Sequence, residues 1–205
     1  AVACWHFFLL NKDINFLQNH WESIKRGIIF SLTLQNDKGA IAWNIDDKGE
    51  VDDDYLLTGC SSITKSLECG IAICQTLGHK CLEKEWRIAH TKLIKAIENP
   101  AGIFDLKKDR SKFSMDSYYP ILGGISAKKT ASSLISNIKT TFWIEGLGIK
   151  CVADEPWVTV AETSECSIAF KKMGEDEIAL ELLHNAIAIV DNSSIPYMGW
   201  QYLSL

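Results

Sequence analysis

The chain has 205 residues, 47% of them hydrophobic, and a formal net charge of −5. This length allows one or two domains with a sizeable core. The negative charge disfavours nucleic acid as a partner, since nucleic-acid-binding proteins present a basic face. No uncharged apolar run reaches the roughly 18 residues of a membrane-spanning helix, so the sequence predicts a globular protein without a membrane span.

Helical periodicity recurs along the chain in pairs of segments. Leu17, Trp21, Ile24 and Ile28 follow three- and four-residue steps, which indicates a one-faced amphipathic helix. Residues 63–77 are apolar or small on most sides, which is typical of a buried helix. In chain order, the predicted pairs are 2–10 with 14–35, 56–77 with 83–98, 113–125 with 129–143, and 157–174 with 176–190.

Glycine, proline and acidic residues support these helix boundaries. Gly78 and Gly174 follow the ends of apolar segments, where a left-handed glycine often closes a helix. Asp154 and Glu155 precede Pro156. Proline is tolerated at the first helical position, and carboxylates suit the positive end of the helix dipole. A helix is therefore expected to begin directly after Pro156.

A unit of about 45–55 residues recurs, most clearly between 21–78 and 158–200. Alternating buried and exposed helices in such a repeat predict an all-α fold, an α/α toroid of about four hairpins in a single domain, 1–205. The chain begins inside a helix and stops soon after a Gly–Trp turn, so an incomplete ring or a fragment is expected. A flat α-solenoid is the alternative.

The cysteines and histidines show no metal-site pattern. The seven cysteines are odd in number and none lies in a CxxC motif, which favours free buried thiols in a reducing cytoplasm. The five histidines are scattered without zinc-ligand spacing. Motifs for nucleotide binding and for a serine nucleophile are absent as well. We therefore expect neither a metal nor a cofactor.

Two segments place polar side chains at the starts of predicted buried helices. The first, 113–124, contains Asp116, Tyr118 and Tyr119, an acid beside two aromatic rings that could stack on a substrate. The alternative is that Asp116 or Ser117 caps the helix and that the tyrosines are core residues with hydrogen-bonded hydroxyls.

The second segment, 146–165, is the stronger candidate for a site. Asp154, Glu155 and Trp157 lie at the expected helix start, and Glu162 and Glu165 share a face because they are three residues apart. A carboxylate in a buried helix is costly unless it is hydrogen-bonded. Such an acid either belongs to a structural network or serves chemistry with a raised pKa.

Other polar and aromatic residues have structural interpretations. Thr58, Ser61 and Ser62 are expected to cap the helix at 56–77. Trp43 and Trp200 follow glycine-containing turns and are expected to lock adjacent repeats together. The acidic stretch 46–54 and the basic stretch 107–112 are expected to be solvated loops.

Three segments, Leu57–Ser62, Phe113–Gly124 and Glu145–Thr159, carry a resemblance to known proteins. With them the sequence resembles bacterial α/α-toroid proteins grouped around six-hairpin glycosidases and terpenoid cyclase or prenyltransferase toroids, and in particular an uncharacterised prenyltransferase-like subfamily. Terpenoid cyclases of this fold use a DxDD motif, which Glu50–Asp53 does not meet. The zinc ligands of protein prenyltransferases have no counterpart that we can place.

The glycosidase side of the resemblance fits the residues better, because those enzymes use carboxylates and stacked aromatics at helix ends. It implies a glycoside hydrolase-like enzyme with a small-molecule or oligosaccharide substrate, in which two carboxylates act as acid and base. The expected catalytic residues are Asp116, Asp154 and Glu162, with Glu162 or Asp154 as acid and Asp116 as base. The expected substrate-binding residues are Tyr118, Tyr119, Glu155, Trp157 and Glu165. An isoprenoid-binding enzyme and a non-catalytic helical-repeat binding protein are the alternatives.

Overall fold

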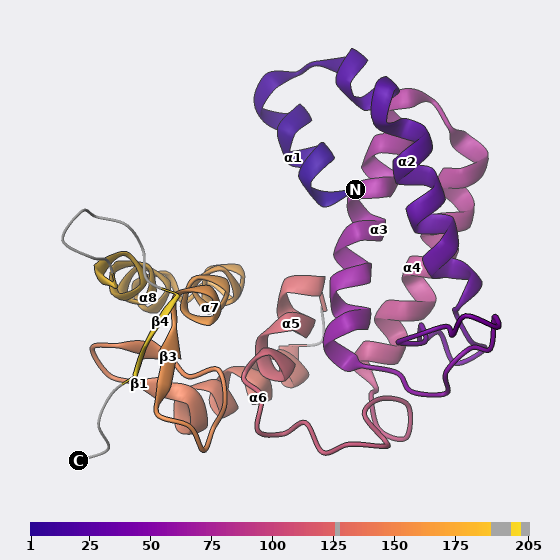
Figure 1. The fold of residues 1–205 in the computed structure, drawn as a ribbon. Coiled ribbons are helices and arrows are strands. Elements are labelled where there is room, and N and C mark those ends of the chain that lie inside the picture. The colour runs from indigo at the N-terminus through magenta and orange to yellow at the C-terminus, as the bar shows by residue number, and fades with distance from the viewer. Residues whose placement is uncertain (126–127, 190–197, 202–205) are drawn as a thin grey trace. The chain divides into compact units, whose positions relative to one another are not determined.

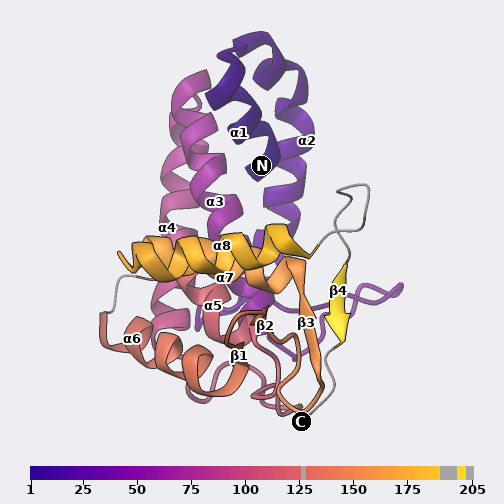
Figure 2. The same cartoon turned by 90° about the vertical axis from the view of Figure 1, so that its left-hand side faces the viewer.

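The computed structural model describes residues 1–125, 128–189 and 198–201, and the chain forms two compact units, 1–107 and 108–205. Within the described residues there are eight α-helices, a short π-helix and four short strands (Figures 1 and 2). The helices follow one another as four consecutive pairs, as the sequence predicts.

Unit 1 contains the first two pairs, α1 (Val2–Asn11) with α2 (Ile14–Thr33) and α3 (Leu57–Leu77) with α4 (Lys80–Glu98). Asp13 caps α2 through the amides of Asn15 and Phe16, at 3.0 and 3.2 Å. Gly78 ends α3 with a φ of 81°, as expected for a helix-closing glycine. The chain then turns directly into α4, so that α3 and α4 pack side by side (Figure 1).

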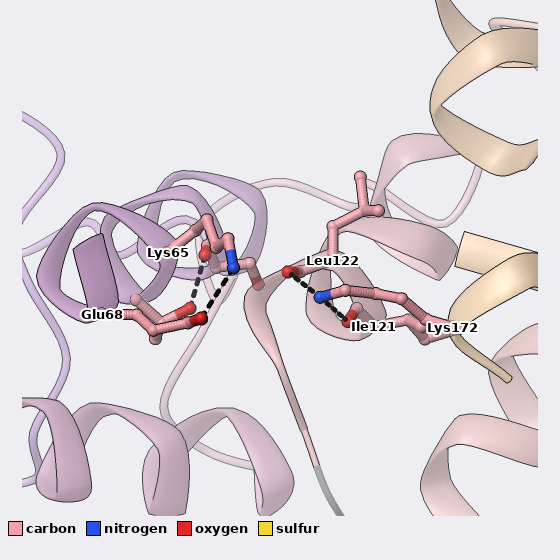
Figure 3. A network of polar contacts seen from close by, with 7 residues as sticks. Lys65, Glu68, Ile121, Leu122 and Lys172 are labelled. Atoms are coloured by element: carbon pink, nitrogen blue, oxygen red, sulfur yellow. Dashed lines mark hydrogen bonds and ion pairs between the residues drawn. The ribbon is translucent and has the colours of Figure 1, made fainter. Parts of the chain in front are cut away.

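The core of unit 1 lies between α2, α3 and α4. Trp21 and Ile28 of α2 and Trp86 of α4 are buried there. A Cβ atom on Gly70 of α3 would lie 2.3 Å from Ile28 Cδ1 and 3.0 Å from Trp86 Cζ3. The glycine therefore allows the three helices to approach closely. On the surface of α3, Lys65 pairs with Glu68 at 2.8 Å (Figure 3).

The segment between α2 and α3 is held by backbone pairing although it has no regular strand. Isolated bridges join Gln35 to Ile41 and Ile45 to Val51. Gly39 has a φ of 93°, and a Cβ atom there would lie 2.5 Å from the carbonyl oxygen of Lys92. Only glycine fits this turn without strain, because the backbone is left-handed and the neighbouring atom is backbone.

Unit 2 contains α5 (Met115–Gly123) followed by α6 (Lys128–Asn137) and the π-helix η1 (Ile138–Phe142), then α7 (Val160–Lys172) with α8 (Asp176–Ala188). α7 and α8 lie side by side (Figure 2). α5 packs on α7, and the core between them includes Tyr118, Ile121, Cys166 and Phe170. Lys172 of α7 donates to the carbonyl oxygens of Ile121 and Leu122 at the end of α5 (Figure 3).

Two small antiparallel sheets complete unit 2. The first pairs β1 (Trp143–Ile144) with β2 (Gly148–Ile149), and the second pairs β3 (Trp157–Thr159) with β4 (Gly199–Gln201). The expectation that a helix begins directly after Pro156 is therefore wrong. Residues 157–159 form a strand, and α7 begins at Val160. An aromatic and two β-branched residues favour a strand here, and β3 pairs both with β4 and with Lys150.

The second copy of the sequence repeat is described only in part, because residues 190–197 lie outside the described ranges. The residues around Trp200, at the end of this copy, were expected to form a turn like the one before Trp43. They form strand β4 instead. The arrangement of the hairpins around a common axis stays a prediction.

Candidate active site

The candidate site lies in unit 2, where α5 faces α7. Tyr118 and Tyr119 on α5 both donate to Glu165 on α7, at 2.9 Å to Oε2 and 3.3 Å to Oε1. The Tyr118 side chain is fully buried, and the two rings lie 5.4 Å apart. Burial, followed by the Glu165 carboxylate, raises the pKa of Tyr118 far above its ordinary value. Its hydroxyl therefore stays protonated and remains a donor.

Glu162 lies one turn before Glu165, in the first turn of α7, and only 9% of its surface is exposed. Thr159 caps this helix start by accepting from the Glu162 amide at 3.3 Å. Both glutamates contribute to the raised pKa of Tyr118. Because both glutamates act on the same tyrosine, the prediction that Glu162 and Glu165 share a face of the helix is consistent with the structure.

The thiol of Cys151 interacts with the Glu162 side chain. Burial, a hydrogen bond to the Glu162 side chain and the charge of that carboxylate together raise the pKa of Cys151 to about 11. The thiol is therefore neutral at neutral pH and can donate to the carboxylate. No local spacing in the sequence signals this contact.

Asp116 lies in the first turn of α5, and 13% of its side chain is exposed. Arg110 forms an ion pair with it, with Nε 3.4 Å from Oδ2, and the guanidinium also lies over the ring of Phe113. The expectation that 107–112 is a solvated loop is wrong for Arg110. Ser117 accepts from Asn137 at 2.8 Å, and no side chain caps α5. The capping half of the alternative for this segment is therefore wrong, whereas its other half, a core tyrosine with a hydrogen-bonded hydroxyl, is confirmed for Tyr118.

Asp154 and Glu155 have a different environment. Both are exposed in the turn that precedes β3, and the turn is closed by the Trp157 amide donating to the Glu155 carbonyl at 2.8 Å. Trp157 is half-buried and pairs with Gln201. Because no helix begins here, neither acid faces a helix dipole.

The start of α3 in unit 1 also differs from expectation. The first amide of the helix, Leu57 N–H, donates to Asp105 at 3.4 Å, and no side-chain hydroxyl caps the helix. Ser61 donates to the carbonyl of Leu57 at 2.7 Å. The expected cap by Thr58, Ser61 or Ser62 is wrong, because a distant aspartate meets the amide instead.

In the described part of the chain, no three His, Cys, Asp or Glu side chains are grouped as metal ligands would be. All seven cysteines are free. Among the described helices, none is long and apolar enough to cross a membrane.

Comparisons with known proteins agree with the glycosidase side of the resemblance. The sequence is 37% identical over 175 residues to the MMP endo-(1,4)-3-O-methyl-alpha-D-mannosidase of Mycolicibacterium hassiacum, a match that covers 85% of this chain and 47% of that protein. The chain thus spans about half the length of this curated relative. No protein-family model matches.

The fold is similar to that of a rhamnosidase from Klebsiella oxytoca with rhamnose bound. The TM-score is 0.64 at 12% identity, over 86% of this chain and 34% of that one. The predicted fold class, an all-α chain of repeated helical hairpins as in glycosidase toroids, is confirmed at this level.

Proposed function

We propose that the chain is part of a glycoside hydrolase that cleaves internal (1,4) linkages between 3-O-methyl-α-D-mannosyl units. The observation that carries this proposal is the 37% identity over 175 residues to a mannosidase of that specificity. The carboxylates and tyrosines between α5 and α7 support it, because glycoside hydrolysis commonly uses an acid and a second carboxylate.

Glu162 is our candidate for the general acid. It lies in the first turn of α7, where Thr159 caps the helix through the Glu162 amide, and one turn before Glu165, which holds the two tyrosines of α5. Glu162 is buried at a helix start, whereas Asp154 is exposed in a turn. Glu162 is therefore preferred over Asp154, with Asp116 as the base, held in orientation by Arg110.

The remaining expected residues would bind substrate or position the acids. Glu165 already accepts two tyrosine hydroxyls, so its role would be to fix Tyr118 and Tyr119. Tyr119 is the less buried of the two tyrosines and could offer a ring face to a sugar. Trp157 and Glu155 lie on the chain that leads into α7, where they could contact neighbouring sugar units. We propose further that units 1 and 2 together form one toroid domain, 1–205.

A second candidate function has one observation in its favour. A non-catalytic binding protein should pair its acids with basic groups, and Asp116 is paired with Arg110. Such a protein would bind the same oligosaccharide without shortening it.

Hydrolysis by the intact protein separates these functions. We expect (1,4)-linked 3-O-methyl-α-D-mannose oligosaccharides to be cut into mid-length products, detected by mass spectrometry. Glu162→Gln and Asp116→Asn should each lower the rate by about 100-fold or more. Glu177→Gln, on an exposed acid of α8, is the control and should keep the rate. Full activity in both site variants would disprove the assignment, and binding without cleavage by the wild type would favour the second function.

The unpaired cysteines support a proposed cytoplasmic location, since secreted proteins commonly pair their thiols. Fractionation of the native host, with the protein detected by antibody, tests this proposal. Recovery outside the cytoplasm would contradict it.

A further inference from the structure

Trp43 in unit 1 is the most conspicuous residue that the proposed chemistry leaves unused. It was expected to lock repeats together, yet 63% of its surface is exposed. An exposed tryptophan offers a large apolar ring to a ligand and loses little conformational freedom on binding. Such a ring would serve as a binding surface if a cavity of suitable size lay beside it.

A cavity of about 280 Å³ lies beside Trp43, at the start of α3. This is just below the roughly 300–1,000 Å³ of typical small-molecule sites, so it suits one sugar unit. Its walls are mostly apolar, with Leu56, Gly59 and Ile63 among them, and the hydroxyl of the exposed Ser62 adds a polar group. An apolar recess with one polar edge is unusual for an unmodified sugar, which carries hydroxyls all round.

The backbone beside the cavity is held in place. The Trp43 amide donates to the Asp54 carbonyl at 2.9 Å. The backbone at Ile41, in the same segment, is held by the buried Cys60 thiol. The thiol accepts from the Ile41 amide at 3.3 Å and lies 3.4 Å from the Ile41 carbonyl oxygen, to which it can donate. Burial raises the pKa of Cys60 to about 11, so the thiol keeps its proton. A surface fixed before the ligand arrives loses less entropy on binding.

We propose that this cavity is a subsite for a 3-O-methyl-mannosyl unit, with the sugar ring on Trp43 and the methyl ether in the apolar recess by Gly59. The inference rests on the proposed function, since it takes the substrate class from there. The methyl group suits the mostly apolar lining of the recess, because burying a methyl ether needs no hydrogen-bond donor. Ser62 remains available to a ring hydroxyl.

Gly59 gives a test that leaves the fold intact. It is helical, and an added Cβ would lie 3.8 Å from both Leu56 Cβ and Trp43 Cε3, at ordinary contact distance. Gly59→Ala therefore introduces a methyl group into the recess without a clash, and it should be at least as stable as the wild type because alanine favours a helix. Any loss of binding then reports on the recess itself.

Binding is measured by calorimetry and saturation-transfer NMR with methyl 3-O-methyl-α-D-mannopyranoside, which has no internal linkage to cleave, and with the unmethylated glycoside. We expect the wild type to prefer the methylated probe by about fourfold, with strong transfer to its O-methyl protons. Trp43→Ala should weaken binding by about tenfold, and Gly59→Ala should remove the preference for the methyl group. Phe30→Ala, which removes an exposed aromatic from α2, is the control and should change nothing.

Wild-type affinities for Trp43→Ala and Gly59→Ala, or no discrimination between the two probes by the wild type, would overturn the subsite. Absence of oligosaccharide cleavage would instead overturn the proposed function. The two failures are distinguishable, because the monosaccharide measurement does not depend on hydrolysis.

Discussion

The starts of α3 and α7 differ in the chemistry that surrounds them, although both helices belong to similar hairpins. At α3 the helix amide is met by Asp105, and the surface beside it is an apolar recess with an exposed tryptophan. At α7 a threonine caps the helix, and Glu165 accepts from the buried Tyr118 and the half-buried Tyr119. Our proposals accordingly assign different tasks to the two helix starts, sugar recognition in unit 1 and acid chemistry in unit 2.

The largest effect on stability is expected for a substitution of Gly39, in the loop of unit 1 that leads to Trp43. Gly39→Ala introduces a Cβ 2.5 Å from the Lys92 carbonyl oxygen on a left-handed backbone, so we expect a loss of more than about 2 kcal/mol in the free energy of unfolding. Urea unfolding followed by circular dichroism measures it. Gly49, with a φ of 85° and open surroundings, is the matched control. Equal losses for Gly39→Ala and Gly49→Ala would show that the contact with α4 is unimportant.

In unit 2 the corresponding test is the hydroxyl of Tyr118. Tyr118→Phe leaves Glu165 with one donor fewer in a buried site, which should cost about 1–3 kcal/mol of unfolding free energy. Tyr119→Phe should cost less, because its hydrogen bond is longer and its side chain less buried. Denaturant unfolding of both variants checks the order. A reversed order would contradict the arrangement described for Glu165.

The cap of α7 is expected to contribute less. Thr159→Ala removes the acceptor for the Glu162 amide and should destabilise the protein by about 1 kcal/mol. Thr76→Ala, at an exposed position of α3, serves as the comparison and should stay within about 0.5 kcal/mol of the wild type. If Thr159→Ala were equally neutral, the capping bond would not be what fixes the first turn of α7.

The smallest expected effect is on thiol reactivity and leaves stability unchanged. With a pKa of about 11, roughly a hundredth of Cys151 is thiolate at pH 9, so iodoacetamide should modify it slowly. Glu162→Gln removes the carboxylate charge that helps raise this pKa, so it should speed the reaction below pH 11. The exposed Cys81 is the internal reference in peptide mass spectrometry. An unchanged Cys151 rate in Glu162→Gln would place the two groups out of contact.

Helix pairs could be predicted from the sequence because apolar periodicity and helix-closing glycines are local signals. Helices α1, α2 and α3 begin within a residue of their expected starts. The strand at 157–159 was missed, since acids followed by proline are typical of a helix start. Its pairing partner lies some 40 residues further on, at Gly199–Gln201.

The candidate site was only partly predictable for the same reason. The shared face of Glu162 and Glu165 follows from helical spacing alone. The hydrogen-bond donors to Glu165, Tyr118 and Tyr119, lie 47 and 46 residues away from it, and neither hydrogen bond has a local signal. The exposure of Trp43 depends on how the loop before α3 packs, and a glycine-containing turn is compatible with a buried or an exposed ring.

Steady-state kinetics of Glu162→Gln and Trp43→Ala on the (1,4)-linked 3-O-methyl-α-D-mannose oligosaccharide tests the division between units 1 and 2 most directly. The account predicts that Glu162→Gln lowers kcat by about 100-fold with little change in KM, since the acid acts in the transition state. Trp43→Ala should raise KM by about tenfold with kcat nearly unchanged, since it removes uniform binding. A full kcat in Glu162→Gln, or a loss of kcat in Trp43→Ala without a change in KM, would contradict it.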